Sequence, residues 1–174
     1  MKNIIWISAC SIFLWSCSDQ AKPEFDSCEA HAEYVFAKET AFVESDFNPE
    51  LSSELMREYA AFANSCSNDS LAPEFLMRRA DMLRGKGKTI EAISAFTAIH
   101  DGYPHYPNKV NCALISAFLY DTVLNDKEMA EKIYQEVVNL YPDTEEAKKA
   151  KVALKYLRET PEELFRRLNL DANK

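Results

Sequence analysis

Three histidines, His31, His100 and His105, have the side chains with the widest range of chemistry in this 174-residue chain. Imidazole binds metal ions and exchanges protons near neutral pH. No two of these histidines lie at the helical spacing that a shared metal site needs. The sequence also contains no Gly-x-Ser-x-Gly, no phosphate-binding glycine loop and no Cys-x-x-Cys. We therefore expect no metal site, no cofactor and no enzymatic activity.

The cysteines suggest a covalent crosslink. Cys28 and Cys66 lie 19 residues on either side of Phe47, so a helical hairpin that turns near Phe47 brings both thiols to its open end. We expect a disulfide there, which the loop-entropy relation values at roughly 4 kcal/mol. The alternative is two free, partly buried thiols. Cys112 falls within a helical pattern and is expected in the core.

Cys17 follows a segment with the features of a signal peptide. Residues 1–16 hold one lysine and then an apolar stretch over 4–14, too short to span a bilayer as a helix. The stretch ends in Leu-Trp-Ser-Cys17, which resembles the lipobox of bacterial lipoproteins. That resemblance implies cleavage before Cys17 and acylation of this residue, and Ser18 resembles an outer-membrane sorting signal. The alternative is an ordinary signal peptide, although the leucine at −3 does not fit one.

Two basic clusters could bind an anionic partner. The candidate residues are Arg78, Arg79, Arg84, Lys148, Lys149, Lys151 and Lys155. If they lie on helices that line a groove, its cationic ends can clamp an acidic peptide or a C-terminal carboxylate. The alternative is that both clusters are solvated helix faces.

The elements that hold these residues are predicted to be helices. The chain has only 3 glycines, where average composition predicts roughly a dozen, and this favours helices joined by tight turns. Residues 17–27 form a polar tether. Residues 28–44 and 50–66 have apolar residues at helical spacing, and Asn48 is a plausible N-cap between them. We expect residues 28–71 to form a helical hairpin.

A repeat follows this hairpin. Prolines recur at positions 73, 107 and 142, at spacings of 34 and 35 residues. Each interval contains small and large apolar residues where two crossing helices need them: Leu76, Ala80, Leu83, Ala92, Phe96, Ala117, Tyr120, Ala130 and Tyr134. Gly85 and Gly87 are predicted at the turn within the first repeat, and Asn125 at the matching turn of the second. A last amphipathic helix begins at Pro161 and is expected to cap the end of the stack.

This period and packing pattern resemble the tetratricopeptide repeat (TPR), a helix–turn–helix unit of 34 residues. Residues 141–150 are similar to the TPR domains of the periplasmic partner of the Tol–Pal system and of the lipoprotein of the β-barrel assembly machinery. The resemblance implies an all-α fold, an α-α superhelix over residues 72–170, and the role of a protein-binding scaffold. The hairpin over residues 28–71 could be a degenerate further pair.

The charge distribution limits the kinds of partner. The formal net charge is −8. Residues 17–72 hold 3 basic and 12 acidic side chains, whereas residues 73–174 hold 16 of each. Nucleic-acid binders carry a basic excess, so we expect no nucleic acid partner.

The function we expect is a lipid-anchored TPR adaptor of the Gram-negative envelope. It holds an envelope protein or peptide in its groove and is anchored to the outer membrane through Cys17, on the periplasmic face rather than the cell surface. The alternative is a structural envelope component that contacts peptidoglycan or a polysaccharide.

Overall fold

The computed structural model describes residues 23–46 and 48–171. The signal segment and Cys17 lie outside the described residues. All regular structure in the described part is helical, which confirms the predicted all-α fold. The helices are α1 (Cys28–Glu44), α2 (Pro49–Ser65), α3 (Leu71–Gly85), α4 (Thr89–Gly102), α5 (Lys109–Thr122), α6 (Lys127–Leu140), α7 (Glu145–Tyr156) and α8 (Pro161–Asp171).

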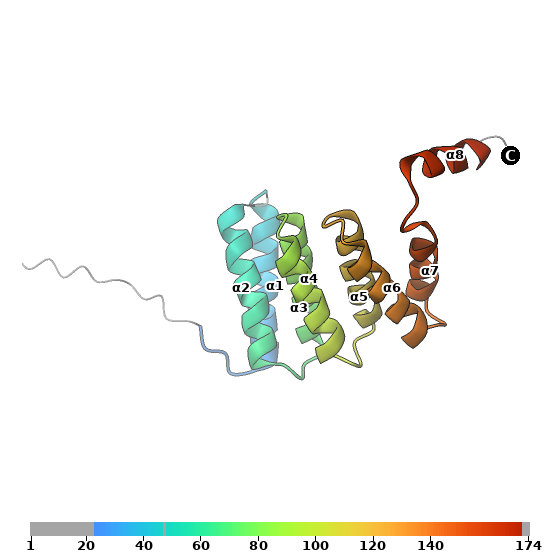
Figure 1. Ribbon diagram of the computed structural model, residues 1–174. Coiled ribbons are helices and arrows are strands. Elements are labelled where there is room, and N and C mark those ends of the chain that lie inside the picture. The colour runs from blue at the N-terminus through green and yellow to red at the C-terminus, as the bar shows by residue number, and fades with distance from the viewer. Residues whose placement is uncertain (1–22, 47, 172–174) are drawn as a thin grey trace, which may run out of the picture.

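From α1 to α7 each helix packs chiefly against the next one along the chain (Figure 1). Short connections make consecutive helices antiparallel, so the chain forms a row of helical hairpins. The helices of odd number form one layer of this row and those of even number the other, and α5 also touches α7.

The turns within the hairpins share one backbone feature. Asp46, Gly87 and Asn125 have φ values of 54°, 72° and 52°, and they lie at the α1–α2, α3–α4 and α5–α6 turns. A left-handed residue after a helix lets the chain reverse while the last carbonyls keep hydrogen-bond partners. Lys88 N–H accordingly donates to Leu83 O, and Asp126 N–H to Tyr120 O. The predictions for Gly87 and Asn125 are confirmed, whereas Gly85 is the last residue of α3.

The interior divides into three consecutive apolar clusters. The first lies among α1, α2 and α3, the second among α3, α4 and α5, and the third among α5, α6 and α7. Seven of the nine predicted packing residues are buried: Ala80, Leu83, Ala92, Phe96, Ala117, Ala130 and Tyr134. Alanines at the helix crossings allow close approach of the backbones, and the aromatic rings fill the space between neighbouring pairs.

The other two predicted packing residues join adjacent clusters. Leu76 packs against both the first and the second cluster, and Tyr120 against both the second and the third. Both are half-buried. The row of hairpins therefore has a continuous core, and the N-terminal hairpin belongs to the same stack as the repeats.

The prediction that α8 caps the stack is wrong. This helix turns away from the stack (Figure 1), and Leu164, Phe165 and Leu168 are 41%, 68% and 53% exposed. The capping box between Thr160 and Glu163 fixes where the helix starts. An amphipathic pattern shows that one side of α8 would be more stable if it were buried, but it does not show that the fold provides a surface to bury it. The exposed side of α7 carries mainly lysines, which do not form such a surface.

Candidate partner-binding surfaces

Arg78, the first of the predicted binding residues, is committed to internal contacts. Its Nη1 donates to Glu39 Oε1 at 2.6 Å, and its Nε donates to Glu74 Oε1 at 3.4 Å. The buried Tyr59 hydroxyl also donates to Glu39 Oε1, at 2.6 Å. Burial, together with the hydrogen bond to Glu39, raises the pKa of Tyr59. Arg78 therefore links α3 to α1 and α2 instead of pointing a free charge into a groove.

This network continues towards α5. Tyr106, in the α4–α5 connection, donates its hydroxyl proton to Glu74 Oε2 at 2.7 Å. Asn108 Nδ2 donates to the Tyr106 hydroxyl at 3.3 Å. A chain of polar contacts thus runs from α1 through α3 to the start of α5. Its carboxylates neutralise the arginine that the sequence pattern suggested for ligand binding.

The rest of the first basic cluster is also partly neutralised. Arg84 Nη2 lies 2.8 Å from Asp81 Oδ1, and the nearby Lys88, the residue before α4, has its Nζ 3.0 Å from Glu91 Oε1. Arg79 is half-buried beside Leu83 in a groove. The first cluster therefore does not form one cationic patch.

The second basic cluster is different because its four lysines are exposed. Lys148, Lys149, Lys151 and Lys155 all lie on α7. Lys148 pairs with Glu145 one turn earlier, and the Lys155 ammonium lies 5.0 Å from the centre of the Tyr156 ring. An exposed pair within one helix contributes little free energy, so it can be exchanged for a partner's carboxylate. All four lysines are therefore accessible on α7.

Phe118 was missed by the sequence reasoning and is the most unusual residue near this cluster. It is 51% exposed, although its neighbours Ala117 and Leu119 are buried. On α5 it points opposite to the buried side, and Val152 on α7 is likewise exposed, at 59%, opposite to the buried alanines of that helix. A helical-wheel comparison with Val110 and Ala117 could have identified it, because Phe118 falls off their stripe.

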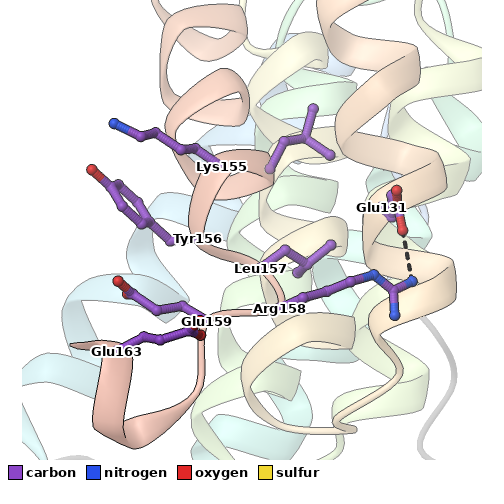
Figure 2. A pocket seen from close by; sticks show the side chains of 8 residues that line it. Glu131, Lys155, Tyr156, Leu157, Arg158, Glu159 and Glu163 are labelled. Carbon is purple, nitrogen blue, oxygen red and sulfur yellow. Dashed lines mark hydrogen bonds and ion pairs between the residues drawn. The ribbon is translucent and has the colours of Figure 1, made fainter. Parts of the chain in front are cut away.

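A small cavity of about 440 Å³ lies where α7 gives way to α8 (Figure 2). Arg158 crosses its edge and pairs with Glu131 at 2.7 Å, and Lys155, Tyr156 and Glu163 line the rest. The hydrogen bonds that Arg158 donates to Glu131 and Glu128 raise its pKa. The hydrogen bond from Arg167 lowers the pKa of Glu159. Both shifts favour the charged forms, so these groups form ion pairs and neither is tuned as a general acid or base.

A larger groove of about 1550 Å³ follows α2 and the segment before α1. At its end Cys28 and Cys66 form the disulfide that the sequence predicted, with an Sγ–Sγ distance of 2.08 Å and a Cα–Cα distance of 5.8 Å. His31 and Phe25 line the groove beside it. Cys112 is a free thiol deep in the second cluster, and burial raises its pKa to about 12. This thiol therefore stays protonated and unreactive at neutral pH.

The histidines do not gather. His100 Nδ1 contacts Asp101, and its Nε2 contacts the Tyr141 hydroxyl at 3.0 Å. His105 is exposed in the α4–α5 connection. Among residues 23–46 and 48–171, no group of three or more His, Cys, Asp or Glu side chains could hold a metal ion. Over the same residues, none of the helices is long and apolar enough to span a membrane.

Comparisons with protein-family models, with curated proteins and with solved structures gave no match. The functional argument therefore depends on the surfaces of this chain itself.

Proposed function

We propose that this protein is a lipid-anchored helical-repeat adaptor of the TPR class in the Gram-negative envelope. It holds an acidic segment of another envelope protein against α5 and α7 and is tethered to the outer membrane through Cys17. The regular turns at Gly87 and Asn125 and the three linked clusters support a repeat scaffold. Stacked repeats present a long, rigid surface whose side chains are free to specify a partner.

The observation that carries the proposal is the surface on α5 and α7. Lys148 and Lys155 lie one turn on either side of Val152, so all three share one side of α7. Phe118 is exposed on α5, a helix that touches α7. An exposed aromatic ring on α5, together with an exposed valine edged by lysines on α7, combines an apolar anchor site with charges that orient the partner. We call Phe118, Val152, Lys148, Lys151 and Lys155 the α5–α7 surface.

This arrangement defines the chemistry of the partner. A helix with one apolar side chain at its centre and carboxylates one turn away on either side matches the α5–α7 surface in both polarity and spacing. The lysines contribute mainly to the association rate and to selection against basic segments. The aromatic contact contributes most to the lifetime of the complex.

The test is affinity purification of the lipidated protein, with crosslinking, from its native envelope. We expect a defined protein partner whose recovery falls at least tenfold in the charge-reversal variant Lys148→Glu/Lys155→Glu. The matched control is Lys86→Glu/Lys132→Glu, which reverses two exposed lysines away from this surface. Equal recovery by both variants would reject the surface. Recovery of an insoluble sugar polymer in place of protein would support the structural alternative.

The anchor is tested separately. The mass of the protein extracted from membranes is expected to show acylation at Cys17 and loss of residues 1–16. A Cys17→Ser variant is expected to leave the membrane fraction. An unmodified cysteine in the mature protein would contradict the anchor and leave the adaptor proposal to be judged by the purification.

A further inference from the structure

The segment before α1 is bound to the N-terminal hairpin through one aromatic side chain. The Phe25 ring stacks on the His31 ring, with centroids 4.1 Å apart and an interplanar angle of 10°. The Phe25 ring also meets Tyr34 at 5.2 Å. Ser27, two residues later, caps α1 by accepting a hydrogen bond from Ala30 N–H. Residues 23–27 therefore lie along the groove instead of extending directly into solvent.

His31, beneath Phe25, is only 4% exposed. The Ser65 hydroxyl donates to Ala61 O at 3.0 Å, so we assign the proton of His31 to Nδ1, which donates to Ser65 Oγ at 3.1 Å. Nε2 is then a lone-pair acceptor. It is the single buried side-chain nitrogen or oxygen without a partner in the described part of the chain.

The surroundings of His31 supply no acceptor for a second ring proton. Phe25 covers one side of the ring, and Phe62 lies at 5.2 Å across the core. Glu58 on α2 acts on His31 through charge alone, without a hydrogen bond. His31 also lies in the first turn of α1, where the helix dipole disfavours a positive charge.

The other charged and titratable groups around the Phe25–His31 contact have partners of their own or are exposed to solvent. On α1, Lys38 is paired with Glu54 of α2 at 2.7 Å and also lies 5.1 Å from the centre of the Tyr34 ring. In the leading segment, Glu24 and Asp26 are exposed. Cys28 and Cys66 are bonded to each other and do not titrate.

We propose that acid releases residues 23–27: protonation of His31 at Nε2 displaces Phe25 from the His31 ring and frees the segment before α1. We call residues 23–27 the latch. The step is a simple protonation: Nε2 takes a proton from solvent, and the imidazolium has both N–H groups as donors. While Phe25 covers His31, the new N–H has no acceptor, whereas water supplies one once Phe25 has left. Release therefore lowers the free energy of the protonated state without breaking the disulfide.

The direction of the pH dependence follows from burial. Burial lowers the pKa of His31 below 6.5, and the charge of Glu58 opposes this effect. The released state leaves His31 in water and so binds the proton more tightly. The ratio of released to latched molecules must then rise as the pH falls below 6.5, by about tenfold for each unit that separates the two pKa values.

The consequence is a change in reach. A fully extended chain spans at most about 3.3–3.6 Å per residue, so freeing five residues extends a connection through the N-terminal segment by up to roughly 17 Å. The latch thus sets how far the helical stack can move from whatever holds the chain before Pro23. This inference concerns the N-terminal hairpin and stands apart from the α5–α7 surface.

The test is a pH titration of the full-length chain by nuclear magnetic resonance, from pH 7.5 to pH 4.5. The probes are the His31 ring nitrogens and the proton contacts between Phe25 and His31. We expect these contacts to disappear with a midpoint below 6.5 while the signals of the second and third clusters stay native. His31→Phe, which keeps an aromatic ring but cannot titrate, is expected to hold Phe25 in place at pH 4.5.

Two further variants complete the design. Glu58→Gln is expected to move the release midpoint to lower pH, because the charge that helps protonate His31 is lost. His105→Phe changes an exposed histidine in the same way and is expected to leave the midpoint unchanged. The proposal is overturned if Phe25 stays stacked while His31 titrates. It is equally overturned if release is unchanged in His31→Phe, or if the whole chain unfolds together with the segment.

Discussion

At its N-terminal end the helical stack is closed by covalent and polar links, whereas at its C-terminal end it is left open. Helices α1 to α3 share a disulfide, an aromatic cluster and the bonds of Glu39 to Tyr59 and Arg78. At the other end, α7 presents lysines and α8 lies apart with its apolar side exposed.

This difference indicates that the two ends of the stack have different roles. The closed end is acidic and carries the groups that fix structure, including an arginine that the sequence pattern assigned to binding. The open end has exposed lysines on α7 and exposed apolar side chains on α8. Binding surfaces require side chains whose interactions are not already satisfied within the fold.

The largest expected difference between the two ends concerns aromatic residues. Phe75 is fully buried among α1, α2 and α3, whereas Phe165 on α8 is mostly exposed. Phe75→Ala is expected to lower the free energy of unfolding by about 3–5 kcal/mol, because it leaves a cavity. Phe165→Ala should change it by less than about 0.5 kcal/mol. Denaturant titrations measure both, and similar losses would mean that α8 packs on the stack in solution.

The disulfide gives the next effect. Cys28→Ala/Cys66→Ala is expected to lower the free energy of unfolding by about 2–4 kcal/mol. Without the disulfide the two positions, 38 residues apart, are no longer held together in the unfolded chain, which raises its conformational entropy. Reductant should destabilise the wild-type protein by a similar amount and leave the double variant unchanged. If reductant affects both equally, the bond is not the cause of the stability at this end.

A polar substitution refines the comparison. Glu39→Gln removes the carboxylate shared by Arg78 and the buried Tyr59, and we expect a loss of about 1–2 kcal/mol. Glu145→Gln breaks the exposed pair with Lys148 and is expected to cost less than about 0.5 kcal/mol. Thermal melts of the two variants at equal salt provide the measurement. Equal melting temperatures would show that the Glu39 network adds nothing beyond a surface pair.

Alkaline pH tests the middle and the far end of the stack together. Burial raises the pKa values of Tyr106 and Tyr134 to about 12, from 10.0. A raised pKa in the folded state gives stability that is complete below pH 10 and is lost as the pH rises towards 12. We expect a fall of about 1 kcal/mol per buried phenol by pH 11. Tyr134→Phe should reduce this slope, and an unchanged slope would exclude Tyr134 as a source.

Much of the fold could be predicted because it depends on local chemistry. Asn48 caps α2 through hydrogen bonds from Glu50 and Leu51 N–H, and Asn125 turns the chain, as short-range signals indicated. The disulfide could be predicted because Cys28 and Cys66 are equally far in sequence from the turn near Phe47. Each of these features depends on residues close together in the sequence or on simple symmetry.

The sites were harder to predict because they depend on residues far apart. Arg78 finds Glu39 across 39 positions of the chain, and no spacing rule connects residues on α1 and α3. The exposure of α8 depends on whether the end of α7 offers an apolar surface, which amphipathicity alone does not reveal. The unpartnered atom of His31 appears only once Phe25 and Ser65 are placed around it.

The α5–α7 surface is tested most directly by photo-crosslinking in the native envelope, with a benzophenone amino acid replacing Phe118. The matched control position is Ile90, an exposed residue on α4 of the other helix layer. We predict that position 118 captures one protein, that position 90 does not, and that Lys148→Glu/Lys155→Glu abolishes the capture. Equal crosslinking from both positions, or capture that survives the charge reversal, would contradict the proposed docking of an acidic partner on α5 and α7.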